Sequence, residues 1–62
     1  MRRVFVACIS EEEHFWTALL QDDVDGPIAQ IDGDREEVIA WGKKQEAEQH
    51  WLHGPDGLLP LT

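Results

Sequence analysis

Residues 34–41 read D-R-E-E-V-I-A-W, and they contain the one clear helix start in the chain. Asp34 is typical of an N-cap, because its carboxylate accepts hydrogen bonds from the free amides of the first turn. Glu37 occupies the reciprocal position of a capping box. The glutamates of the first turn favour the positive end of the helix dipole, and Lys43 and Lys44 favour its negative end. The sequence therefore predicts a helix that begins at Asp34.

The apolar spacing of this helix gives its buried face and its end. The apolar residues at helical spacing are Val38, Ile39 and Trp41. The spacing fades after Gly42, so we expect the helix to end near Lys44. Gly42 either ends the helix or leaves a gap through which the helix approaches a sheet closely. Residues 45–49 are compatible with helix, loop or strand.

The segments around the helix are predicted to be strands, because they are rich in β-branched and aromatic residues and are bounded by turn residues. The expected strands cover residues 2–10, 15–22, 27–31, 49–53 and 58–61, with turns at 11–14 and 54–57. The predicted fold class is α+β. A small antiparallel sheet, made of the N-terminal hairpin and a short third strand, is packed by one helix, and a C-terminal hairpin follows (β-β-β-α-β-β).

The register of the first hairpin follows from its turn. If residues 11–14 form the loop, Ser10 faces Phe15, and Arg3 and Arg2 face the acids Asp22 and Asp23. The face expected to receive the helix carries Phe5, Ala7, Ile9, Trp16, Ala18 and Leu20. The opposite face carries Val6, Cys8, Thr17 and Leu19.

This opposite face is the basis of the functional hypothesis. A sheet that is solvated on one side should alternate apolar and polar residues, and here the alternation fails. One short helix covers only one face, and a chain of 62 residues buries little core by itself. We therefore expect a second copy, in a homodimer, or a partner protein to cover Val6, Cys8, Thr17 and Leu19. The alternative is that the C-terminal segment folds back over this face.

Composition limits the classes of partner that the protein can bind. Residues 1–62 form one domain, and a single cysteine excludes an internal disulfide. The net charge of −8 disfavours nucleic acid and anionic membranes as partners but permits a basic protein. The longest apolar run, residues 4–9, is too short to span a bilayer, and we expect a cytoplasmic protein. The acids expected to contact a basic partner lie near the hairpin turns: Glu11, Glu12, Glu13, Asp22 and Asp23.

The sequence predicts no catalytic residue, cofactor or metal ligand. His50 and His53 would share a face on a helix and could then ligate an ion, but they point to opposite sides of the expected strand. His14 is expected to be a solvated turn residue, and Cys8 a buried thiol rather than a nucleophile. Residues 23–26 are similar to a fragment of a calcium loop without its closing glutamate. The loop aspartates Asp22, Asp23, Asp25, Asp32 and Asp34 are assigned to turns and caps, with divalent-cation binding as the alternative.

The order of three strands and a capped helix over residues 4–40 resembles the HicB-type antitoxin domain. The stretch 26–40, GPIAQIDGDREEVIA, is similar to that family's third strand, Gly-Asp turn and acidic helix start. The resemblance implies a small unit that dimerises and neutralises a messenger-RNA-cleaving toxin. Residues 21–23, Q-D-D, stand where the family has a proline-containing turn. The expected C-terminal hairpin stands in place of a DNA-binding segment, so repressor activity is not implied.

Three functions follow from these observations. The first is a small non-catalytic acidic protein that acts through protein–protein contacts, as an antitoxin-like or regulatory binding module. The second is an acidic mimic of nucleic acid that inhibits a basic DNA- or RNA-binding protein. The third is a small metal-binding protein or enzyme that uses His14, His50 and His53.

Overall fold

The computed structural model describes residues 1–54 and 57–61 and contains five strands and one helix. The elements are β1 (Arg2–Ser10), β2 (Phe15–Asp22), β3 (Gly26–Gly33), α1 (Arg35–Lys44), β4 (Gln49–Gly54) and β5 (Gly57–Pro60). The predicted order β-β-β-α-β-β is confirmed, and β3 is longer than expected. Residues 45–48 are neither helix nor strand. The predicted turn at 54–57 includes residues 55 and 56, which lie outside the described part of the chain.

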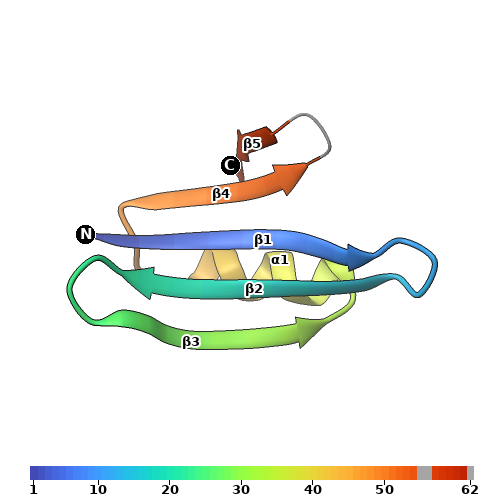
Figure 1. The fold of residues 1–62 in the computed structure, drawn as a ribbon, viewed down its shortest axis with the longest axis horizontal. Helices are drawn as coiled ribbons and strands as arrows, with labels where there is room; N and C mark the ends of the chain where they lie inside the picture. The colour runs from blue at the N-terminus through green and yellow to red at the C-terminus, as the bar shows by residue number, and fades with distance from the viewer. Residues whose placement is uncertain (55–56, 62) are drawn as a thin grey trace.

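The five strands form one mixed sheet in the order β3-β2-β1-β4-β5 (Figure 1). Neighbouring strands are antiparallel except β1 and β4, which are parallel. The predicted antiparallel pairing of the first three strands is confirmed, but the C-terminal hairpin joins the same sheet through a parallel pair, so the sheet is not purely antiparallel. The chain leaves β3 at one edge, crosses the sheet through α1 and returns beyond β1. A helical crossover of this kind returns the chain in its original direction, so β4 runs parallel to β1.

Helix α1 lies on one face of the sheet, behind it in the view of Figure 1. The buried apolar residues are Val4, Val6, Ala18, Leu20 and Val38. Partly buried residues packed against them include Trp16, Ile31, Ile39, Trp41, Leu52 and Leu61. The predicted helix face is thus confirmed, as is the N-cap, because the Asp34 carboxylate accepts the Glu37 amide at 2.9 Å. No helix among the described residues is long and apolar enough to cross a membrane.

The register of the first hairpin differs from the prediction by one residue. Ser10 faces Phe15 as expected, but Cys8 already faces Trp16, so Ile9 is an extra residue in β1. A bulge of this kind moves every side chain beyond it to the other face. The helix therefore packs on Val4 and Val6 rather than on Phe5, Ala7 and Ile9.

The ion pairs of the hairpin shift with the register. Arg2, rather than Arg3, faces Asp22, with 3.9 Å between the Arg2 Nε and a carboxylate oxygen. The Arg3 guanidinium pairs with the Asp23 carboxylate instead. Basic residues meet acids as predicted, but each arginine has the other's expected partner.

Gly42 explains why this register is preferred. It lies inside α1 and is buried, and a Cβ atom at this position would lie 3.2 Å from Val4 and 3.3 Å from Val6. Of the two alternatives for Gly42, the structure shows the close approach of helix and sheet. So close a backbone leaves room beneath it for valines but not for the ring of Phe5, which in the predicted register would lie on this face.

Candidate functional site

The face of the sheet opposite α1, here called the open face, carries a row of apolar side chains. The register places Leu19 beside Phe5, Phe5 beside Trp51, and Trp51 beside Pro60, so the row crosses four strands. Leu19, Phe5 and Trp51 are half-buried, and Pro60 is exposed. In the part of the chain that the structure describes, no helix covers this row (Figure 1). An aromatic centre left accessible on a small protein is typical of a contact surface.

Polar residues border the apolar row on one side. Gln21, Arg3 and Gln49 form the adjacent row of the register. The amide oxygen of Gln49 accepts hydrogen bonds from the Arg3 Nε and the Trp51 Nε1, both at 3.1 Å. The indole N–H of Trp51 is therefore satisfied within the chain. An apolar partner surface can cover the Trp51 ring without leaving that donor unpaired.

Polar residues also border the row along the β3 edge. The Thr17 hydroxyl lies 2.7 Å from an Asp32 carboxylate oxygen and accepts a hydrogen bond from the Gln30 side-chain amide at 3.1 Å. An apolar centre with a hydrogen-bonded polar rim is the usual composition of a protein–protein interface.

The structure divides the predicted contact residues between the two faces. Thr17 and Leu19 lie on the open face as expected. Val6 and Cys8 lie on the helix side, where Val6 is fully buried, because the Ile9 bulge shifts their register. Phe5 and Trp51 take their places. The apolar residues of segment 49–53 could have indicated Trp51, but nothing in the sequence places this strand beside β1.

A groove lies on the helix side of the same sheet, beyond the start of α1. Helix α1 covers only part of the sheet, and two adjoining hollows of about 440 and 420 Å³ lie next to its first residue. We call these hollows together the Trp16 groove. Both are lined by Cys8, Glu11, Trp16 and Arg35. The first is also lined by His14, Asp34 and Glu36, and the second by Ile9, Leu52, His53, Gly54 and Leu59.

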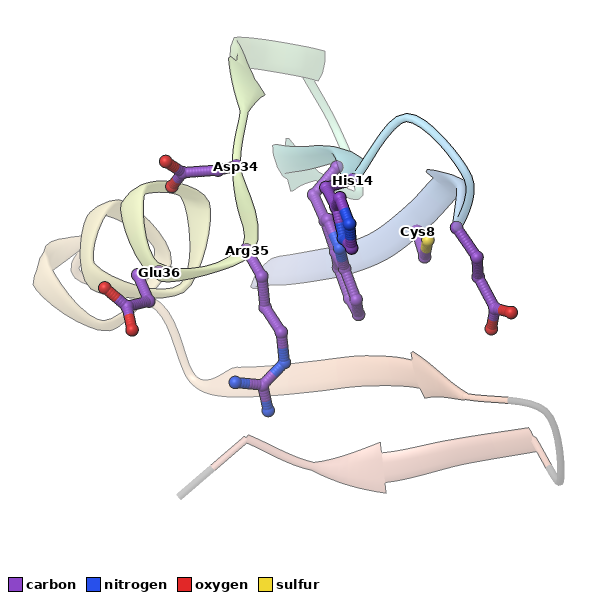
Figure 2. A pocket seen from close by; sticks show the side chains of 7 residues that line it. Cys8, His14, Asp34, Arg35 and Glu36 are labelled. Carbon is purple, nitrogen blue, oxygen red and sulfur yellow. The ribbon is translucent and has the colours of Figure 1, made fainter.

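The cationic side chain of Arg35 lines both hollows of the Trp16 groove. The guanidinium carbon of Arg35 lies 5.8 Å from the centre of the Trp16 ring, within the range of a cation–π contact. In Figure 2, Arg35 projects from the start of α1, while His14 and Cys8 lie on the side of the β1–β2 turn. Asp34 and Glu36 point away from His14 in this view. Asp34 is also occupied as the helix cap.

The predicted acidic residues do not form one patch. Glu11, Glu12 and Glu13 lie in the turn before β2, and Asp22 and Asp23 lie at its other end, a distance of about 26 Å for eight residues of strand. This arrangement does not favour a continuous acidic surface of the kind that a nucleic-acid mimic needs.

Asp22 and Asp23 also stabilise the fold. Hydrogen bonds from the Val24 and Asp25 amides, followed by the N-terminal ammonium and Arg2, lower the pKa of the Asp22 carboxyl below its ordinary value. Asp23 is paired with Arg3. Glu48 is engaged in a similar way. Hydrogen bonds from the amides of Arg2 and of Glu48 itself lower its pKa.

The histidines lie apart in the described chain. His50 and His53 are on β4 as predicted, and the His50 Nε2 lies 3.0 Å from the Gln45 carbonyl oxygen. His14 lies in the β1–β2 turn with a positive φ of 52°, and it lines the first hollow. Cys8 is half-buried rather than buried. Within residues 1–54 and 57–61, no three His, Cys, Asp or Glu side chains are placed to hold a metal ion.

The chain matches no protein-family model, no curated protein and no solved structure. The open face and the Trp16 groove are therefore interpreted from their own geometry.

Proposed function

We propose that this protein is a small non-catalytic protein-contact module, and that it works as a homodimer in which the open faces of two copies pack together. The apolar row Leu19–Phe5–Trp51–Pro60 is the observation that carries this proposal. Two sheets that pack face to face bury such rows between them at a spacing of about 10 Å.

The distribution of charge favours a second copy as the partner. The chain carries a net charge of −8, yet among the residues that the structure describes the register places only Arg3 and Asp32 as charged residues beside the apolar row. Most of the acids lie in turns, in α1 and around residues 46–48. Two open faces can therefore meet without strong repulsion at their centres, although the molecules repel each other at long range.

The small core supports association as well. Five apolar side chains are buried in the described chain, and the largest of those with no exposure are valines. A domain of this size buries a smaller fraction of its surface than a larger domain does, so covering Phe5, Leu19 and Trp51 would add substantially to its stability. A two-fold dimer uses the same surface on both copies, which an apolar row flanked by polar rims allows.

Sedimentation equilibrium over a concentration series tests the proposal. We expect a mass of twice the 7.1 kDa of one chain at about 100 µM, where a dimer of micromolar affinity is almost fully associated. A single-chain mass at that concentration would contradict it.

Two substitutions locate the interface. Leu19→Arg places a charge in the apolar row and should weaken dimerisation at least about tenfold. Leu58→Arg, at a half-exposed position on β5 beside the row, tests the same surface with less risk to folding. The matched control is Val24→Arg, which adds the same charge at a turn residue that is 89% exposed. Equal effects at Leu19 and Val24 would show that net charge, and not the open face, controls association.

Antitoxin activity is a more specific version of this proposal. The element order over residues 4–40 still fits the resemblance to the HicB-type domain. Co-expression with the product of the neighbouring gene tests it, and a toxicity that this protein does not relieve would remove the antitoxin version. The homodimer would still stand.

A further inference from the structure

The Trp16 groove lies on the opposite side of the sheet from the open face, so binding in this groove does not depend on the homodimer. Helix α1 packs on the Val4 and Val6 part of β1 and leaves the Cys8 end of the same face uncovered. The hollows there have the size of ligand-binding sites, for which about 300–1,000 Å³ is usual.

The groove already holds one cation of the chain itself. Arg35 lies over Trp16, but it is exposed and forms no ion pair with any residue that the structure describes. It is also the first residue of α1, where the helix dipole disfavours positive charge. Few interactions therefore hold Arg35 over the Trp16 ring. A second cation can replace it there.

The surroundings of the ring favour a cation over an anion. Glu11, Asp34 and Glu36 line the first hollow, where Arg35 is the only arginine or lysine, so carboxylates outnumber cations. Glu12 and Glu13 continue the same exposed turn. The Glu11 carboxylate has no hydrogen-bond or ion-pair partner among the described residues and is free to pair with a ligand. An anionic ligand would have to approach these acids without compensation.

The second hollow requires an apolar group on the ligand as well. It is lined by Ile9, Leu52 and Leu59, of which Ile9 and Leu59 are 57% and 50% exposed. A free amine or a metal ion would leave these side chains uncovered. A peptide that carries an aliphatic side chain next to a basic one would cover both hollows.

We propose that the Trp16 groove binds a basic segment of a partner protein. An Arg or Lys side chain of that segment takes the place of Arg35 over the Trp16 ring and pairs with Glu11. A neighbouring aliphatic side chain enters the second hollow, between Leu52 and Leu59.

Nuclear magnetic resonance with a short capped peptide tests this proposal. The probe is acetyl-Gly-Leu-Arg-Leu-Gly-amide, and the signals are the indole N–H groups of the three tryptophans. We expect a saturable shift at Trp16 that weakens with salt, and little change at Trp51 on the open face. The same peptide with neutral citrulline in place of arginine should bind at least about fivefold more weakly. A shift confined to Trp51, no saturable shift at about 10 mM peptide, or equal binding of the citrulline peptide would overturn the proposal.

Two pairs of variants separate a specific site from general attraction of a cation to an acidic protein. Arg35→Gln removes the internal competitor and should tighten peptide binding about two- to fivefold, whereas Lys43→Gln removes the same charge at the other end of α1 and should not. Glu11→Gln should weaken binding more than Glu46→Gln, an exposed acid outside the groove. Equal effects within each pair, or weaker binding by Arg35→Gln, would overturn the proposal.

Discussion

Strand β1 presents different side chains to the two faces of the sheet. On the helix side, β1 contributes Val4 and Val6, which are completely buried beneath Gly42. On the open face, the same strand contributes Phe5, which lies between Leu19 and Trp51 and is only half-buried. Of these three residues of β1, the largest, Phe5, therefore lies on the face without a helix.

This difference shows which side chains of β1 the helix can cover. Gly42 brings the backbone of α1 so close that only small β-branched side chains fit beneath it. Phe5, the aromatic residue of β1, must then lie on the other side, where a second molecule would be needed to bury it. Close packing on one face thus leaves an aromatic side chain on the face that we propose as the contact surface.

The largest expected difference is between two neighbouring residues of β1. Val6→Asp places a carboxylate in the core without a partner and should cost more than about 4 kcal/mol, enough to unfold a domain of this size. Phe5→Asp should leave the fold intact and abolish the proposed dimer. Circular dichroism and light scattering distinguish the two results. The register expected from the sequence, without the bulge at Ile9, predicts the opposite results for the two variants, because it buries Phe5 and exposes Val6.

A smaller difference is expected between the two sides of α1. Gly42→Leu should destabilise the protein by about 2–3 kcal/mol, because the side chain would overlap Val4 and Val6. Ala40→Leu introduces the same side chain at an exposed position of the helix and should change stability by less than about 0.5 kcal/mol. Urea denaturation measures both. A similar loss for the two variants would mean that α1 does not approach the sheet through Gly42.

The helix cap should contribute less than the packing of the helix. Asp34→Ala removes the acceptor of the Glu37 amide and should cost about 1 kcal/mol. Asp25→Ala removes an equal charge from the β2–β3 turn, where no side-chain hydrogen bond of Asp25 occurs among the described residues, and it should be nearly neutral. Thermal denaturation at neutral pH compares the two. A cap that contributes no more than Asp25 would indicate that tertiary packing alone fixes the start of α1.

The smallest effect concerns acid stability. Because hydrogen bonds from Val24 and Asp25 lower the folded-state pKa of Asp22 below 3.8, its ionised form stabilises the fold above that pH. This contribution is lost as the pH falls through the lower folded-state value. Asp22→Asn should therefore reduce the fall in the urea midpoint below about pH 4. Asp25→Asn is the control, and an identical acid profile for the two variants would contradict this role of Asp22.

Much of the local structure could be predicted from the sequence. The Asp34 cap, the end of α1 at Lys44 and the limits of β1 and β2 agree with the structure, because each depends on residues a few positions apart. The candidate site was predicted only in part. The existence of an uncovered apolar face followed from the failed alternation and the single short helix, but half of its expected residues, Val6 and Cys8, belong to the covered side.

The sequence by itself determined the helix, its cap and the order of the strands, since these follow from local hydrogen bonding and hydrophobic spacing. Only the tertiary structure decided the bulge at Ile9, the parallel pairing of β1 with β4 and the contact of Arg35 with Trp16. All three depend on segments distant in the chain. The bulge fits the close approach of α1 to Val4 and Val6, and the other two follow from where α1 crosses the sheet, which no local pattern encodes.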